Sequence, residues 1–177
     1  MFKIIGLIFV GVLLGGCESM SESECRTADW GRVGFKDGAA GVAEQRLAAY
    51  TDDCGKIGVR PNAQAYRQGW DAGIKRYCTA SNGWRAGTDG QENKAQVCVG
   101  QAGEAEFSRY LDAGLQVYRT QQQIENNTRE IDRLQKQLTN SKNDDERRRI
   151  RRQLQSIDND QYRLRILMGQ QQLMAPR

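Results

Sequence analysis

Four cysteines in the middle of this 177-residue chain limit the folds that are open to it. They are Cys25, Cys54, Cys78 and Cys98, and successive members are 29, 24 and 20 residues apart. A structural zinc site usually takes a close pair such as Cys-x-x-Cys, often together with histidine, and the sequence has neither. We therefore expect no metal and two disulfide bonds, for which four cysteines allow three pairings.

The beginning of the chain predicts export from the cytoplasm. Lys3 precedes an apolar stretch of eleven residues, 4–14. A membrane-spanning helix needs about 20 such residues, so this stretch is typical of a signal peptide. An exported chain reaches a compartment in which disulfides form and persist.

The end of the signal indicates a lipid anchor. Leu14-Gly15-Gly16-Cys17 resembles a lipobox, at which lipoprotein signal peptidase cuts before a cysteine that carries diacylglycerol. We expect Cys17 to become the first residue and to carry three acyl chains such as palmitate, and more than one chain anchors a protein stably. Glu18, in place of the aspartate of inner-membrane lipoproteins, favours the outer membrane, with the protein facing the periplasm. The alternative is an ordinary secretory signal with a chance cysteine.

Glycine and charge divide the mature chain in two. Thirteen of the fifteen glycines beyond Cys17 lie between Gly31 and Gly103, whereas residues 119–177 carry 13 basic and 8 acidic side chains. The predicted organisation is a signal peptide (1–16), a short linker (17–24), a cysteine- and glycine-rich domain (25–118) and a helical tail (119–177).

One of the three disulfide pairings conflicts with a predicted helix. Pro61-Asn62 favours a helix start, and the following residues suit a helix as far as Tyr77. Such a helix is about 24 Å long, whereas the Cα atoms of a disulfide lie within about 7 Å. Because Cys54 precedes this helix and Cys78 follows it, we least expect them to pair. The other two arrangements stay open.

Glycines recur at helical spacing in the cysteine-rich domain. Gly34 and Gly38 are four residues apart, as are Gly69 and Gly73. Each glycine costs a helix interior about 1 kcal/mol relative to alanine, which close approach of another backbone would offset. Residues 66–77 also resemble residues 107–118, at an offset of 41, with a partial version at 35–38. We interpret this echo as similar packing of short helices rather than as a repeated binding site.

Residues 79–90 contain the turn-forming pairs Asn82-Gly83 and Asp89-Gly90. Both residue types tolerate positive φ, so we expect a disulfide-tethered loop or short hairpin that carries Trp84. A phosphate-binding loop would need glycines that lead into a helix with lysine or threonine in register, which is absent here.

The order of these residues resembles a known family. Asp29-Trp30, the glycines at 34 and 38, Tyr77-Cys78, Asn82-Gly83 and Cys98 are similar to an uncharacterised family of Gram-negative lipoproteins, catalogued as domain of unknown function 2799. The resemblance covers roughly residues 25–118, and such proteins often continue into a helical tail. It departs at 94–97, where Lys-Ala-Gln-Val stands in place of an expected tyrosine and glycine. It implies the compartment and the domain boundary, and no activity.

The C-terminal part predicts coiled-coil helices. Apolar residues with an occasional polar one recur every three or four positions in two seams, with charges elsewhere. The first seam is Ile124, Asn127, Ile131, Leu134 and Leu138, and the second is Ile150, Leu154, Ile157, Gln161, Leu164 and Met168. Between them, Asn143 and Glu146 have capping-box spacing. We predict an antiparallel helical hairpin, with one long rod as the alternative.

The tail also carries an arginine face, formed by Arg148, Arg149 and Arg152. These positions point away from the seam, and we interpret them as a solvated face with helix-stabilising pairs Asp144–Arg148 and Asp145–Arg149. The alternative is a site for an anionic lipid or polymer. Nucleic acid is not expected, because no aromatic residue is interleaved with the arginines.

The fold class is therefore mostly α, a small disulfide-stapled helical domain with a loop or hairpin insertion followed by a coiled-coil hairpin. The sequence lacks histidine, the commonest general base, and no serine lies in a Gly-x-Ser-x-Gly elbow. With the cysteines oxidised, we expect no enzyme activity and no cofactor. The first hypothesis is a module that binds an envelope protein or a second copy of itself. The alternative is a module that binds an anionic envelope component through the arginine face, and an unfamiliar hydrolase is the third hypothesis.

Overall fold

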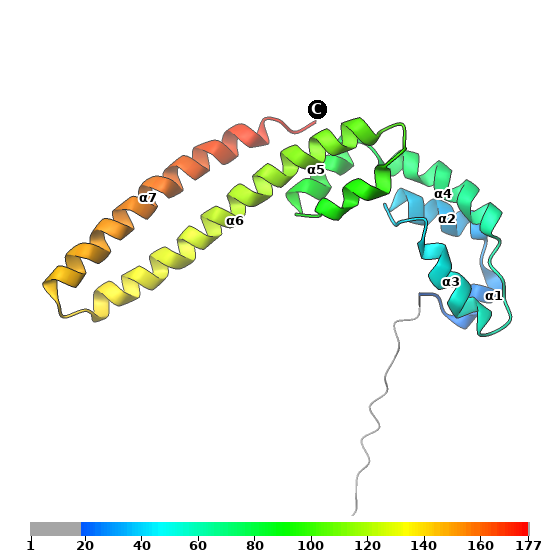
Figure 1. Cartoon of the computed structure of the whole chain (residues 1–177), viewed down its shortest axis with the longest axis horizontal. Helices are drawn as coiled ribbons and strands as arrows, with labels where there is room; N and C mark the ends of the chain where they lie inside the picture. Colours follow the sequence, from blue (N-terminus) through cyan, green and yellow to red (C-terminus); the bar gives the residue numbers. More distant parts are fainter. Residues whose placement is uncertain (1–18, 177) are drawn as a thin grey trace, which may run out of the picture.

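A computed structural model describes residues 19–176, and all the regular structure in this part of the chain is helical (Figure 1). The predicted signal peptide and Cys17 lie outside the described residues, so the lipid anchor stays a prediction. The elements in chain order are α1 (Glu22–Thr27), α2 (Trp30–Ala39), α3 (Arg46–Gly55), α4 (Ala63–Tyr77), α5 (Ala80–Thr88), the 3-10 helix η1 (Glu92–Cys98), α6 (Glu104–Asn140) and α7 (Asp144–Gln172).

Side-chain caps begin several of these helices. Asn62 accepts a hydrogen bond from the backbone N–H of Ala65 at 3.0 Å, so α4 begins where Pro61-Asn62 predicted it. Thr79 caps α5 in the same way, and Asn143 caps α7. Each cap satisfies a backbone donor that has no partner within the helix.

The helix α5 is a departure from the expected loop or hairpin over residues 79–90. Gly83 and Gly87 do not form turns but lie inside the helix, against α6. Only Gly90, with φ of 73°, has the backbone conformation that the turn prediction implied. Local turn chemistry therefore gave the wrong structure here, because the glycines serve a contact with a distant helix.

Glycines bring α2 and α4 together at backbone distance. A Cβ atom at Gly34 would lie 2.0 Å from the carbonyl oxygen of Tyr66, and one at Gly38 would lie 2.4 Å from that of Trp70. Residue numbers rise together along the two helices, so they run in the same direction, side by side in Figure 1. The close approach offsets the cost of glycine in a helix.

The helices α5 and α6 repeat this arrangement. Gly83 meets the carbonyl oxygen of Phe107, and Gly87 meets that of Leu111 and the Cα atom of Gly114. The two pairs end alike as well, because the positive-φ glycines 41 and 90 lie against the rings of Tyr77 and Tyr118. The similar segments 66–77 and 107–118, which are 41 residues apart, therefore belong to the second helix of each pair. The partial version at 35–38 belongs to the first helix of a pair, α2.

Each helix pair is closed by a disulfide. Cys25 bonds to Cys54 and Cys78 to Cys98, with Cα atoms 5.5 and 5.6 Å apart. In both units the bridge joins a residue before the first helix of the pair to a residue before the second. Two disulfides are thus confirmed, and Cys54 does not pair with Cys78.

The long helix α6 belongs to two packing units. Its first turns pack against α5, and its later turns pack against α7, so the predicted boundary at 118/119 falls within one continuous helix. The α6–α7 hairpin extends away from the glycine-packed helices (Figure 1). The predicted antiparallel hairpin is confirmed, and the single rod is wrong.

Candidate interaction surface

The seam of the hairpin is buried at a few positions. Leu134 on α6 and Ile150 on α7 are 1% and 2% exposed. The amide of Gln161 donates to the carbonyl oxygen of Ile124 at 3.4 Å and to the hydroxyl of Thr128 at 3.1 Å. These pairs fix the antiparallel register, and Gln161 is the polar member expected in the second seam.

The rest of the seam is only half-buried. Two helices cover each other along one line and leave the flanks of that line open to solvent, whereas a larger bundle would enclose them. The half-buried seam positions are Ile124, Asn127, Ile131, Leu138, Leu154, Ile157, Leu164 and Met168.

A second apolar feature lies on α7 outside the seam. The side chains of Tyr162, Ile166 and Leu173 are 68%, 47% and 86% exposed. With Gly169 they are spaced by four, three and four residues, which places them along one helix face. We call these four residues the α7 stripe. The sequence analysis did not predict it, although the four- and three-residue spacing of these positions is visible in the sequence.

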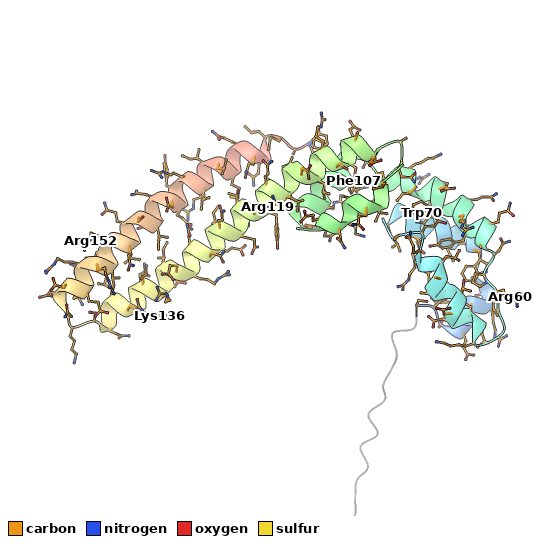
Figure 2. All side chains as sticks on the ribbon, in the orientation of Figure 1. Arg60, Trp70, Phe107, Arg119, Lys136 and Arg152 are labelled. Carbon is orange, nitrogen blue, oxygen red and sulfur yellow. A yellow bond between two sulfur atoms is a disulfide. The ribbon has the colours of Figure 1, made fainter. Side chains whose placement is uncertain are left out.

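The arginine face is exposed, as expected. Arg148, Arg149 and Arg152 all face solvent, and Figure 2 shows Arg152 and Lys136 at the end of the hairpin far from Arg60. The pairing differs from the expectation, because Arg148 forms an ion pair with Asp145, three residues earlier, instead of with Asp144. Exposed pairs of this kind contribute little stability.

The neighbouring Arg147 has a structural role that the sequence did not suggest. Its guanidinium donates to the carbonyl oxygens of Leu138 and Ser141 at 3.0 and 2.9 Å. These carbonyls lie at the C-terminal end of α6, where backbone acceptors lack helical partners. Arg147 therefore closes the turn between α6 and α7.

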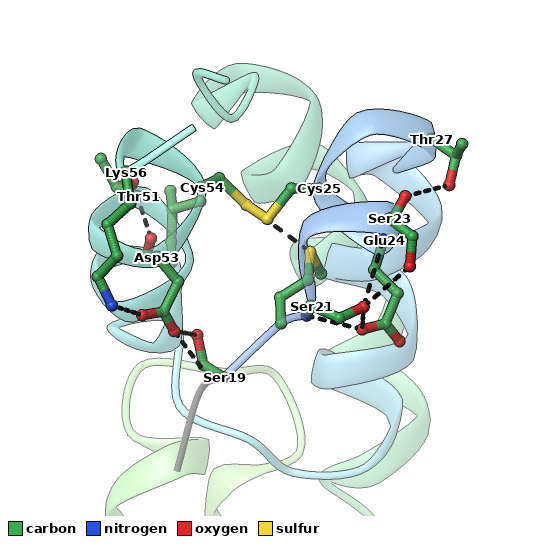
Figure 3. The surroundings of a disulfide bond; sticks show 12 residues. Ser19, Ser21, Ser23, Glu24, Cys25, Thr27, Thr51, Asp53, Cys54 and Lys56 are labelled. Carbon is green, nitrogen blue, oxygen red and sulfur yellow. Dashed lines mark hydrogen bonds and ion pairs between the residues drawn. A yellow bond between two sulfur atoms is a disulfide. The ribbon is translucent and has the colours of Figure 1, made fainter. Parts of the chain in front are cut away.

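The first described residue is held firmly to the domain. The backbone N–H and hydroxyl of Ser19 donate to one oxygen of Asp53 at 2.7 and 2.6 Å, and Lys56 donates to the other oxygen at 2.7 Å (Figure 3). Hydrogen bonds from Lys56 and Ser19 hold the pKa of the Asp53 carboxyl well below its usual range. The chain is thus fixed beside the Cys25–Cys54 disulfide two residues after Cys17.

A polar cluster ties α2, α3 and α4 together inside the domain. The hydroxyls of Tyr50 and Tyr66 both donate to one oxygen of Asp37, at 3.0 and 2.8 Å. Burial raises the pKa of both tyrosine hydroxyls, and the adjacent Asp37 acts in the same direction. The two phenols therefore remain protonated donors, which suits a structural tie.

An open groove of about 740 Å³ lies where the two helix pairs meet, between residues 41–45, the middle of α4 and residues 93–101. One wall is fixed by Trp70, whose indole N–H donates to the carbonyl oxygen of Val42 at 2.8 Å. The opposite wall is fixed by Lys94, whose ammonium donates to the carbonyl oxygen of Gly41 at 2.8 Å. The Lys94–Gly41 hydrogen bond therefore joins the two sides of the groove and is part of the packing between the helix pairs.

In residues 19–176 no three metal-binding side chains gather, and none of the helices has an apolar stretch that could span a bilayer.

A family model described as "Protein of unknown function (DUF2799)" matches residues 29–116, which include both glycine-packed pairs. No curated protein and no solved structure matches the chain.

Proposed function

The chain belongs to the DUF2799 family through residues 29–116, and this family has no assigned function. We therefore propose a function from the geometry. The protein is a lipid-anchored cell-envelope protein that binds another protein through its α6–α7 hairpin. The disulfide-closed helix pairs serve as the base from which the hairpin extends. The function is binding or assembly, without catalysis.

The observation that carries this proposal is the uncovered apolar surface of the hairpin. Half-buried seam residues and the exposed α7 stripe lie on the same pair of helices. Contiguous exposed apolar side chains on a folded protein commonly mark a surface that another molecule covers. A helical partner suits this shape, because an amphipathic helix recognises a groove between helices through residues three and four apart.

The lipid anchor on Cys17 fits the way the chain enters the domain. Ser19, two residues later, is bonded to Asp53. Two residues span at most about 7 Å, so acyl chains on Cys17 would hold the α1–α3 end close to the membrane. The hairpin turn lies at the other end of the molecule (Figure 1).

A second function is supported by the arginine face. Arg149 and Arg152 are exposed near the hairpin turn, and guanidinium groups bind phosphate oxygens in a forked geometry. An anionic envelope lipid or polymer is the ligand class that this face would take. Such binding weakens as salt concentration rises, whereas contact through Ile and Leu does not.

The test is site-specific photo-crosslinking in intact cells with the full, exported chain. A crosslinking residue at Ile166 should give a discrete protein adduct, and one at Ser156, exposed on another face of α7, should not. The adduct should persist at high salt and in the variant in which Arg148, Arg149 and Arg152 are glutamine. An Ile166 probe that gives no protein adduct would rule out the hairpin as a protein-binding arm. Loss of the adduct at high salt or in the glutamine variant would favour the second function.

A further inference from the structure

Gly169 differs from the glycines within α2, α4, α5 and α6, and shares its open surroundings with Gly55, the last residue of α3. In residues 19–176, the glycines within α2, α4, α5 and α6 each have a backbone atom of another helix within 4 Å of the Cβ position. At Gly169, about seven turns into α7 and three residues before its end at Gln172, a Cβ atom would meet nothing. Glycine in an exposed helix costs up to about 1 kcal/mol relative to alanine, and at Gly169 no contact within the described chain offsets that cost.

The surroundings of Gly169 match those of the glycines that are covered. In α4 an aromatic residue, Tyr66, stands seven residues before Gly73, a large apolar residue three before it, and Tyr77 four after it. In α6 the same positions hold Phe107, Leu111 and Tyr118 around Gly114. In α7 they hold Tyr162, Ile166 and Leu173 around Gly169.

The covered copies show what such a face receives. Gly73 lies against Gly38 of α2, and Gly114 lies against Gly87 of α5, so each crossing has a glycine on both helices. The α7 stripe presents the same kind of face to solvent, with its aromatic and aliphatic side chains exposed. What it lacks is a helix with a glycine at the crossing point.

We propose that the α7 stripe is a homodimer contact, in which α7 of one chain crosses α7 of a second copy at Gly169. A second copy supplies the missing glycine and, through the two-fold symmetry usual for dimers, buries Tyr162, Ile166 and Leu173 against their own equivalents. A two-fold axis along the membrane normal keeps both N-terminal ends on one side. This inference rests on the proposed interaction function and names its partner.

The proposed contact between two α7 helices involves fewer suitable residues than the α2–α4 and α5–α6 contacts. Position 170 is Gln in α7, where α4 and α6 have Ile74 and Leu115, and each α7 brings one glycine where α2 brings three and α5 brings two. The dimer is therefore expected to be weaker than the packing inside the domain, and to depend on the concentration that anchoring in one membrane provides.

A cysteine at the crossing tests the proposal directly. Gly169→Cys should form a covalent dimer when the full, anchored chain is mildly oxidised in cells, because helices that cross at glycine bring the Cα atoms within the roughly 7 Å that a disulfide spans. Ser156→Cys is the matched control and should remain monomeric. Equal crosslinking at both positions, or none at position 169, would overturn the proposal.

The second measurement is sedimentation of the purified mature protein over a concentration series. Gly169→Leu should weaken dimerisation at least about tenfold, because its side chain occupies the crossing point. The monomer accepts this side chain, since no atom lies within 4 Å of the Cβ position, so helicity by circular dichroism should not fall. A wild-type protein that stays monomeric up to about 100 µM would contradict a second-copy contact.

The two proposals fail differently. An Ile166 photo-adduct with a different envelope protein, together with a monomeric wild type, would support the interaction arm and overturn the second-copy contact. The absence of any adduct, together with a monomeric wild type, would count against both.

Discussion

The substitution Gly38→Ala measures how much the fold depends on backbone contact between α2 and α4. Its Cβ atom would lie 2.4 Å from the carbonyl oxygen of Trp70 and 2.7 Å from the backbone nitrogen of Ile74, whereas ordinary contact begins at 3.4 Å. Neither neighbour is the end of a flexible side chain, so the helices must separate by about 1 Å. Such a gap forfeits a quarter to a half of the dispersion energy along the contact.

Two opposing effects determine how much Gly38→Ala lowers the free energy of unfolding. Alanine favours the helix by up to about 1 kcal/mol, and overpacking of a tight contact typically costs 1–3 kcal/mol before repacking losses are added. We therefore expect Gly38→Ala to destabilise the protein by about 2 kcal/mol in net terms. Gly169→Ala is the matched control, because it gains the same helix propensity and meets no atom.

Urea unfolding followed by circular dichroism, with the disulfides intact, gives the comparison. The urea concentration at the unfolding midpoint should fall for Gly38→Ala and stay equal or rise for Gly169→Ala. The m value, the slope of the unfolding free energy against urea concentration, should not change. A Gly38→Ala protein as stable as the wild type would refute the reasoning, because it would mean that the helices tolerate a side chain between them.

Four other predictions concern the anchor, the disulfides, the hairpin and the buried tyrosines. Cys17→Ser should leave the protein unprocessed or soluble, as shown by intact mass and membrane fractionation; unchanged processing and anchoring would remove the lipoprotein proposal. The four bridged cysteines should resist thiol alkylation until reductant is added, and loss of either bridge should cost about 2–4 kcal/mol. Leu134→Asp places a charge at a buried seam position and should abolish most of the tail's helicity, at a cost of several kcal/mol. The raised pKa of Tyr66 keeps its hydroxyl protonated in the folded state, so stability should be fully present below pH 10, the usual tyrosine pKa, and decline above it; Tyr66→Phe should decline less steeply in an alkaline unfolding series.

Sequence reasoning succeeded where the determinants are local or where geometry excludes alternatives. The hairpin follows from two heptad seams and a cap at Asn143, each of which is set by residues within a few helical turns. The rejection of a Cys54–Cys78 bridge follows from the length of the helix between them. Both depend on distances along the chain, which a sequence states directly.

The errors have a common physical origin in glycine. Gly83 has the same local chemistry whether it forms a turn or lies against another helix, and only the position of Phe107, 24 residues later, decides between these roles. The α7 stripe escaped notice for a related reason, since Gly169 gains meaning only by comparison with Gly73 and Gly114. Local sequence does not reveal which helix, if any, a glycine lies against.

The continuity of α6 gives the molecule the mechanics of a lever. Beyond Tyr118 the helix continues to Asn140, a length of about 33 Å, with no proline to act as a joint. A tilt of about ten degrees at the α5–α6 crossing would therefore move the far turn by roughly 6 Å. A partner bound to the hairpin is therefore mechanically connected to the two disulfide-closed helix pairs, and a force applied at one end of α6 is transmitted to the other end.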